Sequence, residues 1–149
     1  MKFYAIKNKD GSVYIMHILD GSDPSKEIAK WGRSYSQAVD SFREIQITDL
    51  PNSNFRDAWT DDGDELKVDM AKARELQLAR IRASRDAKWA DFDRRYMVAQ
   101  RDGLDLSALN SERQMLKDAP ESVEGSIASA DTPEELSDIW PAVLDREAP

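Results

Sequence analysis

Four carboxylates around one glycine form the strongest candidate for metal binding in the sequence. The cluster comprises Asp61, Asp62, Asp64 and Glu65, with Gly63 between them. The calcium loop of an EF-hand needs oxygen ligands at its first, third and fifth positions and glycine at its sixth. With Gly63 in the sixth place, the first and third positions fall on Ala58 and Thr60, which carry no carboxylate. The pattern therefore favours a solvated turn, and we expect no metal site and no cofactor.

Catalysis by a thiol nucleophile or by a histidine triad lacks the residues that it needs. The 149-residue chain contains no cysteine and a single histidine, His17. Disulfides, thiolate ligands, a histidine triad and a multi-histidine zinc site within one chain are thereby excluded. His17 is flanked by Met16 and Ile18 without a nucleophile or carboxylate motif beside it, which favours a structural histidine over catalysis or pH sensing. We expect no catalytic residue and no enzymatic activity.

The charge is distributed unevenly along the chain. The formal net charge is −8, with −4 in residues 1–69, +5 in residues 70–101 and −9 in residues 102–149. Lysines and arginines supply most phosphate contacts, and here the 21 of them are outnumbered by 29 acidic residues, so we expect neither a nucleic-acid nor a membrane partner. The basic segment could instead bind nucleic acid, with its arginines and lysines on the phosphates and with bases stacked on Trp89 and Tyr96. Internal pairing of this segment with the acidic last third is the favoured interpretation.

Five aromatic residues are our candidates for partner binding or assembly. They are Trp59, Trp89, Phe92, Tyr96 and Trp140. Three of them belong to a stripe at helical spacing that also holds Leu78, Ile81, Arg85 and Ala99. Such a face would organise the core or bind a second copy of the chain, so a homo-oligomer is a further expectation. Trp140, next to Pro141, is predicted either to fill a core patch or to anchor an exposed partner.

The first half of the chain carries strand signals. Residues 3–6 and 13–18 are rich in β-branched and aromatic residues, and Asp10-Gly11 between them suits a tight turn, which predicts a β-hairpin. We expect a short helix over residues 27–31 that ends at Gly32, and a strand over residues 44–47. Residues 55–59 and 66–68, on either side of the acidic turn, are predicted to form a second small hairpin.

The second half carries helix signals. No glycine or proline interrupts residues 70–101, Asp69 suits the start of a helix and Gly103 its end. This predicts a helix of about 48 Å, followed by helices near residues 107–117, 122–130 and 133–139. The last of these has Thr132 as its cap and Pro133 in its first turn. The expected fold is α+β: a β-rich module (1–69) packed beside a helical hairpin region with acidic C-terminal helices (70–149).

The N-terminus has no apolar run of signal-peptide length, and no stretch approaches the roughly 20 apolar residues that span a bilayer. We therefore expect synthesis and retention in a cytoplasm.

A series of motifs resembles a family of small proteins of tailed bacteriophages and prophages, encoded near tail and tail-fibre genes. The order of the motifs covers residues 55–141, and residues 1–19 look like the family's usual opening of two strands around an Asp-Gly turn. The motifs are Phe-Arg-Asp-Ala-Trp (55–59), Asp-Asp-Gly-Asp (61–64), Val-Asp-Met-Ala-Lys-Ala-Arg (68–74), Ile-Arg (81–82), Phe-Asp-Arg-Arg-Tyr-Met (92–97), Leu-Lys-Asp (116–118), Thr-Pro-Glu-Glu-Leu (132–136) and Trp-Pro (140–141).

The resemblance implies a non-enzymatic tail-associated protein without catalytic residues. It would be a virion tail or fibre accessory component, or an assembly chaperone for a larger tail or tail-fibre protein, made in the cytoplasm of a bacterial host. Two alternatives stay open. The acidic surface could belong to a host-directed inhibitor that mimics nucleic-acid charge, or a pair of carboxylates could serve a small glycan-acting tail enzyme.

Overall fold

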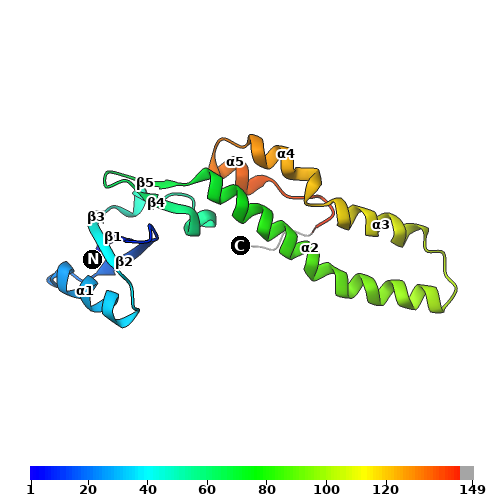
Figure 1. Cartoon of the computed structure of the whole chain (residues 1–149), viewed down its shortest axis with the longest axis horizontal. Helices are drawn as coiled ribbons and strands as arrows, with labels where there is room; N and C mark the ends of the chain where they lie inside the picture. Colours follow the sequence, from blue (N-terminus) through cyan, green and yellow to red (C-terminus); the bar gives the residue numbers. More distant parts are fainter. Residues whose placement is uncertain (145–149) are drawn as a thin grey trace. The chain divides into compact units, whose positions relative to one another are not determined.

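The computed structural model describes residues 1–144 and has the expected α+β fold (Figure 1). Strands β1 (Lys2–Asn8) and β2 (Val13–Ile18) form the predicted antiparallel hairpin, and Gly11 supplies the positive φ of 85° that its turn requires. Strand β3 (Val39–Ile45) pairs with the other side of β1, so the sheet has the order β2-β1-β3.

Both faces of this sheet are covered by other elements. Successive side chains of a strand point to opposite faces, so each strand contributes to two clusters. On one face, Tyr4 and Ile6 of β1 pack with Ile18 and with Ile28 of helix α1 (Pro24–Ser34). On the other face, Ala5 and Ile45 pack with Leu66 of the second hairpin, which consists of β4 (Trp59–Asp61) and β5 (Leu66–Val68). The small sheet thus lies between a helix and a hairpin.

The prediction that α1 ends at Gly32 was wrong, because the helix continues to Ser34. Gly32 is buried, and a Cβ there would lie 3.2 Å from the Gln37 carbonyl oxygen and 3.3 Å from Val39 Cγ2. The glycine therefore allows close packing rather than ending the helix. The chain turns away from the helix at Ser36, whose φ of 54° lets the amide of Gln37 donate to the Gly32 carbonyl.

Two other expectations in this region need correction. The strand expected over residues 44–47 is present as β3, but it begins at Val39 and ends at Ile45. Residues Ile47–Asp49 form the 3₁₀ helix η1 instead. The strand expected over residues 55–59 begins only at Trp59, because Ser53–Ala58 form the 3₁₀ helix η2, capped by the Asn52 side chain. Asn52 competes with the strand through its short polar side chain, which accepts a hydrogen bond from the Asn54 amide.

The long helix α2 has the predicted bounds, Met70–Arg101. The Asp69 carboxylate accepts hydrogen bonds from the amides of Ala71 and Lys72, and Gly103 ends the helix with a φ of 67°. Helices α3 (Ser107–Asp118), α4 (Glu121–Ser129) and α5 (Pro133–Asp138) follow, and Figure 1 shows them returning along α2. The cap at Thr132 is formed as predicted, since Thr132 and Glu135 bond to each other's backbone amides.

The buried stripe of α2 follows the prediction from Ile81 through Phe92 to Ala99. Nearer the start of the helix the inward position is Gln77, which is 3% exposed, and Leu78 is only half-buried. The Gln77 side chain donates to the Ile139 carbonyl oxygen at 2.8 Å. The inward position is therefore occupied by a polar residue with a buried partner, whereas the sequence pattern favoured Leu78.

The packing divides the chain into two units, one ending at Ala73 and the other beginning at Arg74. The first turn of α2 thus belongs to the N-terminal unit, four residues beyond the division predicted from composition. Residues 145–149, part of the expected acidic segment, lie outside the described residues. Across residues 1–144, we find no helix with the length and apolarity that crossing a membrane requires.

Candidate partner-binding surface

Trp59 contributes to the core of the N-terminal unit. Its side chain is buried, and its indole Nε1 donates to the Asn52 carbonyl oxygen at 3.1 Å. The guanidinium of Arg56 lies 5.9 Å from the centre of its ring. In this structure Trp59 therefore holds η2 to β4 and offers little surface to a partner.

Trp89, Phe92 and Tyr96 form one cluster on α2, as the spacing predicted. The Trp89 and Phe92 rings meet edge to face with centroids 5.6 Å apart, and Phe92 and Tyr96 are 5.8 Å apart. Phe92 is buried, whereas Trp89 and Tyr96 are half-buried. The cluster organises the core of the C-terminal unit, and only its two flanking rings reach solvent. Their proposed role in assembly stays a prediction.

Trp140 is half-buried after α5, and its Nε1 donates to the Leu144 carbonyl oxygen at 3.1 Å. That bond folds the end of the described chain back on the Trp140 ring. Because the indole N–H already has a partner, Trp140 serves the fold, and a role as partner anchor also stays a prediction.

Arginines of the basic helix α2 form ion pairs with the acidic helices that follow it. Arg95 donates to both carboxylate oxygens of Glu112 on α3, at 2.9 and 2.5 Å, and Arg82 lies 3.6 Å from Glu124 on α4. The Arg95 hydrogen bonds lower the pKa of the Glu112 carboxyl. Part of the acidic charge is therefore neutralised within the unit.

The acidic turn has a structural role in the N-terminal unit. Asp61 is buried, accepts from Arg43 Nε at 3.2 and 3.3 Å, and also accepts from the Gly63 amide. Hydrogen bonds from the Glu65 amide and the Lys67 side chain hold the pKa of Asp62 well below its usual range. Within residues 1–144, no group of three or more His, Cys, Asp or Glu side chains is arranged to hold a metal ion.

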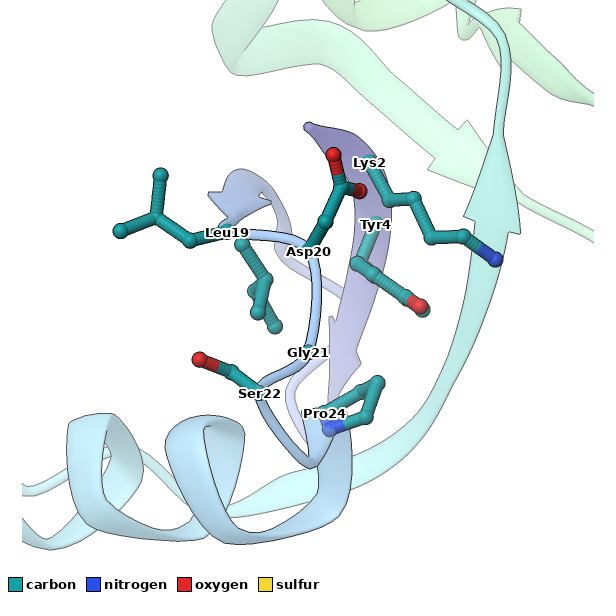
Figure 2. Close-up of a pocket in the computed structure, with 8 residues that line it drawn as sticks. Lys2, Tyr4, Leu19, Asp20, Gly21, Ser22 and Pro24 are labelled. Carbon is teal, nitrogen blue, oxygen red and sulfur yellow. The ribbon is translucent and has the colours of Figure 1, made fainter.

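A small pocket of about 290 Å³ lies where β1, the end of β2 and the start of α1 meet (Figure 2). Tyr4, Ile18 and Pro24 give it an apolar lining. Its charged residues are already paired, because Lys2 donates to Glu44 at 2.8 Å and Asp20 accepts from the amino group of Met1. These bonds raise the pKa of Lys2 and lower the pKa of Asp20. The pocket lies at the lower end of the size range of small-molecule sites, and both of its charged side chains already take part in ion pairs.

Three neighbouring aromatic rings on the N-terminal unit, two exposed and one half-buried between them, form what we call the aromatic surface. It consists of Tyr14 on β2 together with Trp31 and Tyr35 at the end of α1. Ring centroids are 5.1 Å apart between Tyr14 and Trp31 and 6.1 Å apart between Trp31 and Tyr35. Tyr14 is 37% exposed and Tyr35 is 66% exposed.

The polar ends of these rings are free within the described part of the chain. Neither the two tyrosine hydroxyls nor the indole N–H of Trp31 is hydrogen-bonded to another residue there. Large rings that combine apolar faces with unused hydrogen-bond donors are typical of the centres of protein interfaces. The surface can therefore bury apolar area and supply directional bonds at the same time.

Sequence reasoning missed this surface. Trp31 and Tyr35 are four residues apart, the spacing that places two side chains on one side of a helix, and this signal was present. Tyr14 joins them only because it lies opposite Ile6, on the face of the sheet that α1 covers, which no local pattern shows. No protein-family model, curated protein or solved structure matches the chain.

Proposed function

We propose that the protein is a non-enzymatic, tail-associated bacteriophage protein that binds a larger tail or tail-fibre protein. It would act either as an accessory component of the virion or as an assembly chaperone. The observation that carries the binding role is the aromatic surface of Tyr14, Trp31 and Tyr35, whose three polar groups have no hydrogen-bond partner among residues 1–144. The tail context rests on the resemblance of residues 55–141 to small tail-region phage proteins.

The aromatic surface supports binding through large rings that lose little conformational entropy. Trp31 is anchored in the core cluster of α1 and the sheet, so its ring is positioned before a partner arrives. Tyr35 follows at the end of the helix, in contact with Trp31. A preorganised surface of this kind converts more of its buried area into affinity than a mobile one.

The experiment is mass spectrometry of purified, salt-washed virions of the phage that encodes the chain, with infected-cell lysate as control. Recovery near the stoichiometry of a tail protein supports a virion component. Presence in the lysate and absence from virions supports the chaperone role, provided that Tyr35→Ser reduces fibre incorporation. Normal infection and assembly in a strain that lacks the protein would refute both roles.

A second candidate is a host-directed inhibitor that binds a basic protein through acidic surface. The net charge of −9 in residues 102–149 favours it, although Glu112 and Glu124 are partly neutralised by arginines of α2. Such binding would weaken steeply between low and physiological salt, because exposed charges are screened. A complex with a host protein that resists salt would contradict this alternative. Turnover of a host glycan that is lost on replacing a single acid would instead revive the enzyme alternative.

A further inference from the structure

Strand β2 is an edge strand of the three-stranded sheet, and the order β2-β1-β3 leaves its outer side without a neighbouring strand. The Asn8 amide donates to the Ser12 carbonyl oxygen, so by alternation the backbone N–H and C=O groups of residues 13, 15 and 17 point away from β1. Within residues 1–144, no hydrogen bond joins the backbone of β2 to a segment other than β1. An open row of such groups can pair with another extended chain.

The two edges of the sheet differ in charge. Strand β3 carries Asp40, Arg43 and Glu44, and its register with β1 shifts near its start. Charged side chains and irregular register keep an edge from pairing with a like strand. Residues 12–19, which include β2, have the sequence Ser-Val-Tyr-Ile-Met-His-Ile-Leu, without Lys, Arg, Asp, Glu or Pro. The chain therefore protects the β3 edge against self-pairing and leaves the β2 edge without such protection.

The acids nearest to β2 lie in the turns on either side of it and are bound within the chain. Asp10 accepts hydrogen bonds from the amide and the hydroxyl of Ser12. Asp20 accepts from the amino group of Met1. Each carboxylate is thus held in its turn and not in the strand.

A second copy of β2 complements the first in an antiparallel pair. A two-fold axis at Ile15 gives full overlap and places Tyr14 of each copy opposite Met16 of the other, and Val13 opposite His17. Tyr14 is 37% exposed and Met16 is half-buried, so each ring gains an apolar neighbour across the two strands. Contacts between a thioether and an aromatic ring are favourable, and this one is made twice in the pair.

The joined sheet has room for both copies of α1. Helix α1 packs through Ile28 on Tyr4 and Ile6 of the middle strand β1. The two β1 strands would be three strand spacings apart, about 14 Å, whereas packed helices need about 8–10 Å. Tyr14 and Trp31, with ring centroids 5.1 Å apart, lie on the β2 side of each helix and can fill the remaining space.

We propose that two copies of the chain pair antiparallel through β2 about Ile15 and form a six-stranded sheet. The charged β3 strands become its two outer edges. This assembly is closed, because each copy uses its one unprotected edge and the same surface serves both copies. The inference goes beyond the proposed function and does not depend on it.

Backbone pairing is tested by sedimentation equilibrium and NMR hydrogen exchange of the full-length ¹⁵N-labelled protein over a range of concentrations. We expect a dimer in which the amides of residues 13, 15 and 17 are protected, while the outward amides of Phe42 and Glu44 on β3 stay unprotected. Tyr14→Lys should weaken dimerisation about tenfold, because the affected pair occurs twice. Ser41→Lys, an exposed change on β3, is the matched control and should leave the dimer unchanged.

The register is tested by disulfide formation, since the chain has no cysteine of its own. Tyr14→Cys mixed with Met16→Cys should cross-link, because directly opposite residues of such a pair have Cα atoms about 4.5 Å apart. Either variant alone should cross-link far less, since equal positions are about 8 Å apart. Ser41→Cys should not cross-link with either.

Three results would each overturn the inference. They are a monomer at every concentration, exchange of the amides of residues 13, 15 and 17 that dimerisation does not slow, and cross-linking of Ser41→Cys as efficient as that of the mixed pair. Protection that requires an added phage protein would equally contradict self-pairing. Recovery of the protein with virions does not depend on these outcomes, so the proposed function can fail or survive independently.

Discussion

The pair formed by Arg43 and Asp61 is the contact whose removal most sharply tests our interpretation of the acidic turn. It joins β3 to the β4–β5 hairpin, with the Asp61 side chain 5% and the Arg43 side chain 24% exposed. The perturbations are Asp61→Ala, which removes every acceptor, and Asp61→Asn, which removes the charge but keeps one oxygen. Asn can still accept from the Gly63 amide, now 3.0 Å from Oδ1.

The magnitudes follow from the bonds that each change removes. A hydrogen bond to a charged group contributes about 1.5–3 kcal/mol to stability and a neutral one about 1 kcal/mol. Asp61→Ala loses both kinds and leaves the Arg43 guanidinium without its counter-ion, so we expect a loss of about 3 kcal/mol. Asp61→Asn loses mainly the charged bond, about 2 kcal/mol. A double-mutant cycle with Arg43→Met should give a coupling energy of about 2 kcal/mol.

The assay is native-state hydrogen exchange of the β1 amides in the full-length protein, because these amides report on the unit that contains the pair. A coupling energy under about 0.5 kcal/mol would refute a structural role, since non-interacting sites add to within that range. Added calcium should not stabilise the wild-type protein. Calcium-dependent protection that disappears in Asp61→Asn would instead show that the acidic turn binds metal.

Three further predictions concern single positions in the two units. Ser36→Gly should stabilise the N-terminal unit by about 1 kcal/mol in urea denaturation, because glycine adopts the positive φ of this position without strain; a loss of stability would contradict this explanation of the helix end. Phe92→Ala should cost about 3–5 kcal/mol in hydrogen exchange of α2 and α3, since the ring is buried between Trp89 and Tyr96; a cost under about 1 kcal/mol would show that the site collapses or is not core. Glu112 has a pKa lowered below its ordinary 4.5 in the folded state, so its contribution to stability is present above that value and is lost as pH falls through the folded pKa. Glu112→Gln should remove that part of the pH dependence and leave the rest, and an unchanged profile would mean that the ion pair does not form.

Signals that act within a few residues allowed much of the fold to be predicted. Asp10-Gly11, Asp69, Gly103 and Thr132 each satisfy or redirect nearby backbone groups, and each has its predicted role in the structure. One error arose where the role of a residue is set by packing against a segment outside its own helix. Gly32 was taken as a helix end, but its lack of a side chain is needed for packing against residues 37–39.

The same distinction applies to the candidate surfaces. The cluster of Trp89 and Phe92 follows from helical spacing alone, and the structure brings its rings together. Gln77 could not be recognised as inward-facing, because its partner is a carbonyl oxygen 62 residues away. The aromatic surface needs Tyr14 from a strand beside two rings from a helix, so tertiary packing creates it.

The most direct test of the central claim is photo-crosslinking from the aromatic surface during phage assembly. A photoreactive phenylalanine at Tyr35 is compared with one at Gln100, an exposed position on α2 in the other unit. Our account predicts that position 35, and not position 100, forms a crosslink to a tail or tail-fibre protein of the same phage, identified by peptide mass spectrometry. Crosslinks from position 35 only to host proteins, or none above the level at position 100, would contradict it.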